Sequence, residues 1–451
     1  MSYPRVVIAG TGSGVGKTAI TAGIMAQISK NKKLQGYKVG PDFIDPMFHT
    51  LASKRPSRNL DSFFMDESTI KNLFGWASKD AEISVIEGVR GLYDGLTSVG
   101  DEGSTAEIAK FLKAPVILVL NARSLAKSAA AHILGFKLLD PEVNIAGVIL
   151  NNVSGDRHRR KATEAVETLT STPVVGTVEK LPEKLAERHL GLVTTSELDS
   201  SKLLKQVSDM VIDIDLAQIE EIAEKAPDLQ FDDSCPFNIN DSLNKVKIGA
   251  PFDKAYSFYY RENLESLAYA GAEIKYFKPT EGDALPAVDG LYLGGGYPEV
   301  HASEISANKD FLEGLKTFSE DGNVIYGECG GMMTFCSAII NDGEYEMAKI
   351  FSEKAVQTSQ RQGLSYVRAE ATVDNFLFAG QQIKAHEFHY SHLQPVPTGP
   401  FAYSISRGTG FNNGFDGKIV RRTIGTYMHQ HALSNKLWGT SLVNAVLSDR
   451  L

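Results

Sequence analysis

A glycine-rich loop directly after an apolar run is the feature of this sequence that most constrains its fold. Residues 6–9 read VVIA, residues 10–18 read GTGSGVGKT, and a helix-like segment follows at 19–29. A strand that enters a helix through such a loop begins a β-loop-α unit, and the strands of such units pair in parallel. The loop therefore predicts an α/β fold with an anion site at the end of its first strand.

The loop residues suit a nucleoside triphosphate. Backbone N–H groups of a loop that contains Gly12, Gly14 and Gly16 would cradle phosphates, helped by the dipole of the following helix. Lys17 would reach the outer phosphates, and Thr18 would hold Mg²⁺. The plain alternative is a glycine-rich turn without a ligand, but the strand before the loop and the helix after it favour ATP and Mg²⁺.

The spacing departs from the usual phosphate-loop pattern. Thr11 stands where the first glycine would be, Gly10 lies one residue earlier, and Gly12 stands where partitioning ATPases carry a lysine. In these respects the loop resembles dethiobiotin synthetase and its ATP-dependent ligase relatives more than GTPases or chromosome-partitioning ATPases. That resemblance implies activation of a carboxylate.

Short β-branched runs alternate with amphipathic stretches in both halves of the chain. They lie at 6–9, 83–86, 116–120, 145–150 and 174–178, and again at 246–250, 274–277, 290–293 and 323–327. Runs of this kind are typical of parallel sheets covered on both faces, and 451 residues exceed what one core usually supports. We predict an ATP-dependent synthetase domain at 1–200, a helix and acidic linker at 201–243, and a second α/β domain at 244–451.

Acidic residues follow two strands that should flank the loop. Lys38, Asp42 and Asp45 come after one strand, and the strand at 83–87 ends in Glu87, with Asp94 shortly beyond it. Such strand ends are where a phosphate and a carboxylate substrate could meet, and Glu87 has the usual position of a second Mg²⁺ anchor. Taken alone, Glu87 could equally cap the turn that follows it.

Cys329 is predicted on a sharp strand-to-helix turn in the second half. The apolar run at 323–326 leads into GECGG at 327–331, and a helix-like segment follows. Glycines permit a strained turn and close approach of a substrate, and a helix N-terminus would lower the thiol pKa. A buried structural cysteine is the alternative. The strand at 291–293 similarly leads into Gly294, Gly295 and Gly296, whose N–H groups could bind an oxyanion.

A histidine, His429, ends a strand about 100 residues after Cys329. This order of cysteine and histidine resembles the class I glutamine amidotransferases, in which the cysteine opens the glutamine amide and releases ammonia. The resemblance implies that His429 deprotonates Cys329, with His386, His389 and His431 as competing candidates. The acid that usually lies two residues after the histidine is absent, so a dyad is expected.

Motifs along nearly the whole chain resemble the cobyrinic acid a,c-diamide synthase family. They lie at 38–46, 59–61, 87–95, 151–153, 188–192, 258–264, 294–299 and 386–391. The resemblance implies an ATP-dependent synthetase fused to a glutaminase that amidates the a and c acetate side chains of a corrinoid. By the same resemblance, Thr18, Asp45 and Glu87 bind Mg²⁺ and phosphate, Asp42 and Asp94 lie near the substrate carboxylate, and Asn151 reads the adenine. Asn151 could instead cap the turn after its strand.

Three other functions compete with this interpretation. The nearest is the same reaction on nickel sirohydrochlorin, which departures such as Ala385 and Gln430 from the family pattern leave open. A partitioning-type ATPase would have no use for Cys329 and His429, and a non-catalytic regulatory module would hydrolyse no glutamine.

Charge and composition exclude several partners. A net charge of −9 argues against nucleic acid, and no apolar run approaches the roughly 20 residues that span a bilayer. The three cysteines match no metal-binding or disulfide pattern, which favours a reducing cytoplasm. The sequence leaves the oligomeric state open, a homodimer included.

Overall fold

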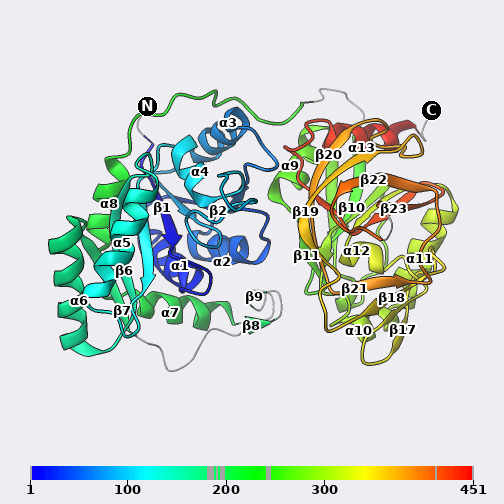
Figure 1. Cartoon of the computed structure of the whole chain (residues 1–451). Helices are drawn as coiled ribbons and strands as arrows, with labels where there is room; N and C mark the ends of the chain where they lie inside the picture. The colour runs from blue at the N-terminus through cyan, green and yellow to red at the C-terminus, as the bar shows by residue number, and fades with distance from the viewer. Residues whose placement is uncertain are drawn as a thin grey trace. The chain divides into compact units, whose positions relative to one another are not determined.

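The chain forms two compact units in a computed structural model. The structure describes residues 3–179, 187–188, 191–192, 199–239, 245–411 and 414–448. The first unit comprises Met1–Pro236 and the second Phe237–Leu451 (Figure 1). Each unit has its own buried apolar core. Two α/β units are found, which confirms the predicted fold class.

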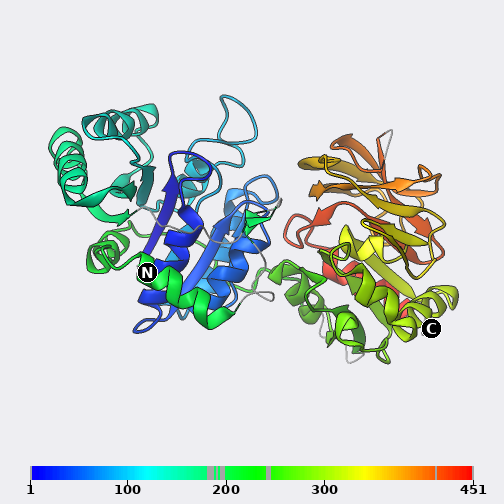
Figure 2. The same ribbon diagram turned by 90° about the horizontal axis from the view of Figure 1, so that it is seen from below.

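A seven-stranded parallel sheet in the order β3-β2-β4-β1-β5-β6-β7 forms the centre of the first unit. Its strands are β1 (Arg5–Gly10), β2 (Leu34–Val39), β3 (Arg58–Leu60), β4 (Ile83–Glu87), β5 (Val116–Asn121), β6 (Ile145–Val153) and β7 (Val174–Glu179). The connecting helices are α1 (Lys17–Ile28), α2 (Ile44–Ser53), α3 (Glu67–Ser78), α4 (Thr105–Phe111), α5 (Lys127–Leu139) and α6 (Gly155–Thr170). These helices lie on both sides of the sheet (Figure 2).

The direction of the chain across this sheet reverses at β1. The chain first moves from β1 to β2 and β3 on one side, and it later continues from β5 to β7 on the other. Ligands of doubly wound sheets bind at such a reversal, at the carboxyl ends of the strands. The glycine loop follows β1 at that point.

Two further helices complete the first unit. They are α7 (Ser200–Met210) and α8 (Leu216–Glu224). Helix α7 packs closely on α1. A Cβ on Gly23 of α1 would lie only 2.3 Å from the carbonyl oxygen of Val207 on α7. Ile214, between the two helices, forms a β-bridge with Gly176. The sequence had suggested one helix and a separate linker at 201–243; the structure has two helices there that pack on the first unit. Residues 240–244 lie outside the described part of the chain.

A ten-stranded mixed sheet forms the centre of the second unit, in the order β12-β10-β13-β15-β24-β23-β22-β19-β20-β25. Its parallel part contains β10 (Val246–Pro251), β12 (Ala272–Phe277), β13 (Gly290–Leu293), β15 (Val324–Glu328) and β24 (Thr423–Thr426). Its antiparallel part contains β19 (Gly363–Ala371), β20 (Gln382–His389), β22 (Phe401–Arg407), β23 (Phe415–Val420) and β25 (His429–Gln430).

Smaller elements surround this sheet. The helices are α9 (Arg261–Tyr269), α10 (Ala302–Ala307), α11 (Lys309–Glu320), α12 (Gly330–Met333) and α13 (Trp438–Leu447). Strand β11 (Tyr256–Phe258) pairs with β14 (Gly295–Gly296), and a four-stranded sheet contains β16 (Ala338–Ile340), β17 (Glu344–Glu346), β18 (Lys354–Gln357) and β21 (Ser391–Gln394). The β11–β14 pair fixes the glycine strand that lies beside the Cys329 turn.

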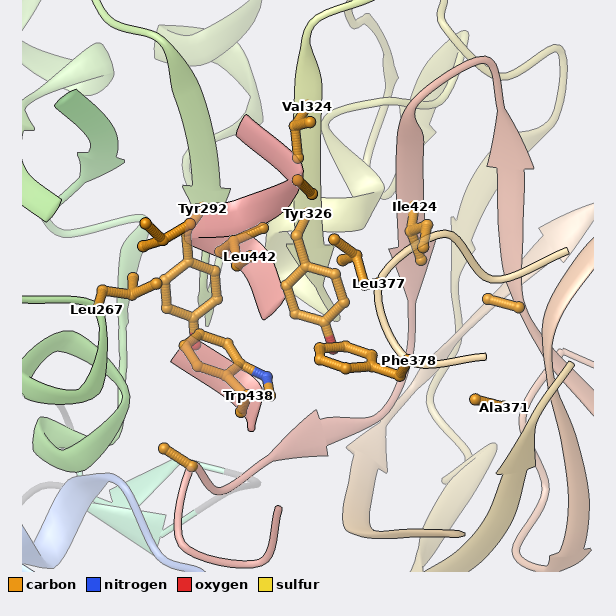
Figure 3. Close-up of a cluster of buried hydrophobic side chains, with 14 of the residues drawn as sticks. Leu267, Tyr292, Val324, Tyr326, Ala371, Leu377, Phe378, Ile424, Trp438 and Leu442 are labelled. Atoms are coloured by element: carbon orange, nitrogen blue, oxygen red, sulfur yellow. The ribbon is translucent and has the colours of Figure 1, made fainter. Parts of the chain in front are cut away.

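Aromatic side chains fill the core beneath the parallel strands of the second unit (Figure 3). The ring of Trp438 from α13 lies edge-on to Tyr292 and Tyr326, with centroid distances of 5.1 and 6.1 Å. Both tyrosines and Trp438 are fully buried. Such aromatic contacts add to the free energy gained from burial alone. They also fix the two strands, β13 and β15, that end at the Cys329 site.

Short strands β8 (Glu187–Arg188) and β9 (Gly191–Leu192) pair with each other, whereas residues 189 and 190 of the motif at 188–192 lie outside the described residues.

Within the described ranges, no helix is both long and apolar enough to cross a membrane.

Candidate active sites

The glycine loop of the first unit closes around the side chain of Lys17. Gly14 and Gly16 have φ angles of +73° and +92°, which residues with a Cβ rarely adopt. The Nζ atom of Lys17 donates to the carbonyl oxygens of Gly12 at 3.1 Å and Arg90 at 2.5 Å. The Lys17 ammonium thus lies between Gly12 of the loop and Arg90 beyond β4, and two main-chain carbonyl oxygens accept its hydrogen bonds.

A buried carboxylate, that of Glu87, connects this loop to the neighbouring strands. Its Oε1 accepts hydrogen bonds from Thr18 Oγ1 at 2.7 Å and Lys38 Nζ at 3.0 Å. Its Oε2 lies 2.5 Å from Nε2 of His49. The Lys38 ammonium also contacts Asp45 Oδ2 at 2.6 Å. Thr18, Lys38, Asp45 and Glu87, which were predicted from three segments of the chain, therefore share one network.

His49 is the member of this network that the sequence analysis missed. It lies on α2, four residues after Asp45, so the two side chains share one helix face. That spacing was a usable signal. A histidine four residues after an acid is common in helices, however. Only the contact with Glu87 distinguishes His49 from such a histidine without a role in the site.

Negative charge exceeds positive charge around Lys38. Burial would raise the pKa of Glu87, but the Lys38 ammonium and the hydrogen bond from His49 hold it well below its usual value. Burial, together with the carboxylates of Asp42 and Glu87, raises the pKa of Asp45 well above its usual value despite the contact with Lys38. A further cation would relieve this repulsion.

The residues present fit a magnesium ion that is completed by phosphate and water. Among the described residues, no three His, Cys, Asp or Glu side chains form a ready-made metal cage. Mg²⁺ in phosphate-transfer sites usually takes only one or two protein carboxylates. The hydroxyl of Thr18 and the carboxylates of Asp45 and Glu87 supply hard oxygen ligands of that kind.

Asp42 and Asp94 both fix the backbone beside the loop. Asp42 Oδ1 accepts from the backbone N–H of Ile44 at 2.7 Å, at the start of α2. Asp94 Oδ2 accepts from the N–H of Gly91 at 3.0 Å. A Cβ on Gly91 would lie 3.4 Å from the Cα of Gly12, so the Asp94 turn packs against the glycine loop. Asp94 therefore lies beside the glycine loop, whereas Asp42 lies at the start of α2, where its charge acts on Lys38 and Asp45.

Asn151 supports the other side of the loop. Its Nδ2 donates to the carbonyl oxygen of Val15 at 2.8 Å, and its Oδ1 accepts from the N–H of Asn152 at 2.8 Å. A Cβ on Gly16 would lie 2.5 Å from the same Nδ2. The side chain, which lies within β6, thus fixes the backbone of the glycine loop at Val15. A role in reading adenine remains a prediction.

The second site begins at the turn that carries Cys329. This residue lies between β15 and α12 with φ +45° and ψ −104°, in a region that is strained for a residue with a Cβ. Its N–H donates to the carbonyl oxygen of Thr426 at 2.7 Å. The predicted sharp strand-to-helix turn is found, and it has the form of a nucleophile elbow.

The environment of the thiol differs from the expectation. Burial, followed by the nearby carboxylate of Glu299, raises the pKa of Cys329 above its usual range. The backbone N–H of Gly330, at the start of α12, does lower the pKa as expected, but burial and Glu299 outweigh it. Burial therefore favours the neutral thiol over the thiolate.

Three neighbouring parallel strands bring Cys329, His429 and the glycine strand together. The strand order is β13-β15-β24, and each group follows the carboxyl end of one of these strands. A Cβ on Gly295 would lie 2.4 Å from Cε1 of His429, and a Cβ on Gly330 would lie 3.0 Å from the backbone nitrogen of Gly296. The imidazole and the elbow thus both border Gly295 and Gly296, where the oxyanion site was predicted.

The competing histidines have other neighbours. His386 lies opposite His429 in the β20–β25 pair, with ring centroids 4.9 Å apart. Burial and the two nearby histidines His429 and His431 lower the pKa of His386. His389 stacks on Tyr427 at 3.7 Å and its Nδ1 contacts the Ser391 carbonyl. Of the four candidates, His429 is the one whose ring borders the glycine strand at Gly295.

Glu328 is an acid near His429 that the sequence analysis missed. Its Oε2 lies 3.5 Å from His429 Nδ1. The sequence signal was its position directly before Cys329, but only the fold shows that the carboxylate turns toward a histidine 101 residues further on.

Comparisons with known proteins find a family match for each of the two units. Residues 6–192 match the model of the CobQ/CobB/MinD/ParA nucleotide-binding domain, and residues 247–437 match that of the CobB/CobQ-like glutamine amidotransferase domain. The fold and the sites thus define a protein that joins a phosphate-loop nucleotide-binding unit to a glutamine amidotransferase unit.

Curated relatives cover nearly the full chain. Proteins called cobyrinate a,c-diamide synthase from Methanosphaera stadtmanae and Methanothermobacter thermautotrophicus are each 44% identical, over 95% of this chain and 95% and 96% of their own lengths. One from Methanocaldococcus jannaschii is 44% identical over 98% of this chain and 99% of its own length. The chain belongs to the cobyrinate a,c-diamide synthase family, which confirms the predicted resemblance.

Proposed function

We propose that this chain is a glutamine-hydrolysing ligase that uses ATP to amidate the a and c carboxylates of cobyrinic acid. The observation that carries the proposal is the presence, in one chain, of a phosphate loop linked to a carboxylate network and of a cysteine elbow beside a histidine. The relatives' shared name supplies the substrate.

The first unit activates the substrate carboxylate. A carboxylate oxygen attacks the γ-phosphorus of ATP, ADP leaves, and an acyl phosphate forms. Lys17 stabilises the charge that develops on the transferring phosphoryl group. Thr18, Asp45 and Glu87 would hold Mg²⁺, which neutralises phosphate charge when bound. Asp42 and Asp94 orient the substrate carboxylate, and Asn151 contacts the adenine.

The second unit supplies ammonia. His429 takes the proton of Cys329, and the thiolate attacks the side-chain carbonyl carbon of glutamine. N–H groups of Gly295 and Gly296 bind the oxyanion of the tetrahedral intermediate. His429 returns the proton to the leaving ammonia, and water then hydrolyses the thioester to glutamate. Ammonia displaces phosphate from the acyl phosphate, so each amide consumes one ATP and one glutamine.

The cellular setting follows from the same chemistry. Cys235, Cys329 and Cys336 are free thiols, and a reducing cytoplasm would keep Cys329 active. Fractionation of the native organism's extract tests this placement.

Turnover of two tetrapyrroles side by side tests the substrate. Purified protein is given ATP, Mg²⁺ and glutamine with either cobyrinic acid or nickel sirohydrochlorin, and products are separated by mass. We expect a diamide from cobyrinic acid. If only nickel sirohydrochlorin gives a diamide, that compound is the substrate and the proposed reaction otherwise stands. If neither compound gives a product, the proposal is refuted.

Variants of Asp42 and Asp94 test substrate placement in the same assay. If these acids orient the carboxylates, Asp42→Asn and Asp94→Asn should change the relative rates of the two amidations, so that a mono-amide accumulates. Normal diamide formation by both variants would remove them from the substrate site.

A further inference from the structure

The carboxylate of Glu328 is buried beside the proposed base of the glutaminase. Glu328 is the last residue of β15, directly before Cys329, and its side chain is 1% exposed. Its Oε2 lies 3.5 Å from Nδ1 of His429. Strand β15 therefore carries both the nucleophile and an acid that reaches the histidine.

Hydrogen bonds fix this carboxylate in place. The hydroxyl of Tyr292 donates to Oε2 at 3.1 Å, and the backbone N–H of Gln430 donates to Oε1 at 3.2 Å. Asn263 donates to the hydroxyl of Tyr292 at 3.1 Å and to the carbonyl oxygen of Gln430 at 2.8 Å. Glu328 thus holds the segment that carries His429 as well as facing its ring.

The Cε1 corner of the His429 ring faces the glycine strand. A Cβ on Gly295 would lie 2.4 Å from Cε1 and at similar distances, 3.3 and 3.4 Å, from Nε2 and Nδ1 of His429. The ring therefore has Nδ1 toward Glu328 and Cε1 toward the oxyanion strand, which places Nε2 on the side of Cε1 away from the contact between Nδ1 and Glu328. A carboxylate at one ring nitrogen selects the tautomer with its proton on that nitrogen, which leaves the other nitrogen as the base.

Other buried carboxylates of the unit have different partners. Glu262 Oε2 lies 3.4 Å from Nε2 of His431, and Glu387 Oε2 lies 3.9 Å from Nε2 of His389. Asp416 accepts from Thr426 Oγ1 and from backbone N–H groups. Of these four carboxylates, Glu328 is the one with a contact to His429.

We propose that Glu328 is a positioning residue that completes a Cys329–His429–Glu328 triad, in place of the acid missing two residues after His429. The inference rests on the proposed glutaminase function. Glu328 keeps the His429 proton on Nδ1 and stays a carboxylate throughout. Nε2 takes the thiol proton of Cys329 and later gives it to ammonia, while the negative charge of Glu328 stabilises the intervening imidazolium.

Two variants of Glu328 and a matched control test the triad in the full-length protein. Glu328→Gln keeps the shape but presents an amide to His429, and Glu328→Asp keeps the charge. Glu262→Gln removes an equally buried carboxylate next to a different histidine. Glutamine hydrolysis, ammonia-dependent amidation and alkylation of Cys329 by iodoacetamide are measured for each.

For Glu328→Gln we expect kcat for glutamine hydrolysis to fall by roughly 10²–10³-fold with KM changed less than about three-fold, as for a wrong histidine tautomer. Alkylation of Cys329 should slow as well, and ammonia-dependent amidation should persist. Glu328→Asp should recover at least about ten-fold over Glu328→Gln, and Glu262→Gln should stay within about three-fold of wild type.

Three results would overturn the triad. They are near-normal kcat in Glu328→Gln, an equal loss in Glu262→Gln, and a loss in Glu328→Gln that appears in KM and in ammonia-dependent amidation. Wild-type protein that hydrolyses no glutamine would overturn both the triad and the proposed function. Normal wild-type hydrolysis with an unaffected Glu328→Gln overturns the triad alone.

Discussion

Burial acts on the charge of one key residue in each of the two sites. In the first unit, burial and then the neighbouring Lys38 lower the pKa of Lys17 to about 8, and carboxylates surround both lysines. In the second unit, burial raises the pKa of Cys329. Burial thus favours the uncharged form of both side chains, so each proposed role needs a partner: the phosphates of ATP for Lys17 and the proposed base His429 for Cys329.

Replacing Lys17 by alanine should abolish amidation with either nitrogen source. We expect a loss on the order of 10³-fold, because no other residue of the loop brings a positive charge to the transferring phosphoryl group. The assay is diamide formation with ammonia, which bypasses Cys329. Lys30→Ala, an exposed lysine just beyond α1 that bonds only locally with Gln27, is the control. Ammonia-dependent turnover by Lys17→Ala near the wild-type rate would refute the ATP site.

Neutral variants of the proposed metal ligands should weaken the response to Mg²⁺. In Glu87→Gln and Asp45→Asn, one of the proposed carboxylate ligands of the metal is lost, so half-saturation should need roughly ten-fold more Mg²⁺. A Mg²⁺ titration of ammonia-dependent amidation measures this. Binding of the tetrapyrrole, followed by its absorbance, should change little. Unchanged Mg²⁺ dependence in both variants would remove these acids from the metal site.

At the scale of elements, the glycine strand β14 and the Cys329 turn depend on close packing. A Cβ on Gly295 would overlap the His429 ring at 2.4 Å. Gly295→Ala should therefore displace the base and lower glutamine hydrolysis by on the order of 10²-fold, with ammonia-dependent amidation retained. At Gly343, a Cβ would meet its nearest atom at 3.4 Å, so Gly343→Ala should behave as wild type. Full glutaminase activity in Gly295→Ala would contradict the packing argument.

Asp416 anchors the turn between β24 and β25 that precedes His429. It accepts from Thr426 Oγ1 at 2.7 Å and from the N–H groups of Tyr427 and Met428 at 3.1 and 3.2 Å. Burial raises the pKa of Asp416 to about 6 despite these bonds, against about 3.9 for an unfolded chain. Because the folded state binds the proton more tightly, this contribution to stability is present at low pH and is lost as pH rises through about 6.

The pH dependence of stability can be measured against Asp416→Asn. Relative to this variant, the wild type should gain about 1 kcal/mol of unfolding free energy when the pH falls from about 7 to 5. Denaturant unfolding, followed by the fluorescence of Trp438 and Trp76, gives the difference. Parallel changes in both proteins would show that another group is responsible.

The elements also show what the sequence could predict. Continuous apolar runs identified most of the parallel strands, though not β2, β3 or β24, and β13 was located residue for residue. The antiparallel strands β19, β20, β22 and β23 were not predicted, because such strands alternate buried and exposed residues and pair over long sequence separations. The same limit applies to Glu328 and His49. Motif spacing located Lys17, Thr18 and Cys329, but contacts between distant segments are set by the fold.

At the scale of the whole molecule, one chain contains two units with separate chemistry. The first has the phosphate loop and the second has the cysteine elbow, and each has its own core. If the second unit supplies ammonia to the first, disabling the second site should abolish amidation with glutamine and leave amidation with ammonia intact.

The most direct test is the nitrogen source used by Cys329→Ser. The variant and the wild type are given cobyrinic acid, ATP and Mg²⁺ with either glutamine or ammonium, and diamide is measured by mass. We predict that Cys329→Ser makes diamide from ammonium at a rate within about two-fold of wild type and makes none from glutamine. Equal loss with both nitrogen sources, or normal turnover with glutamine, would contradict the account.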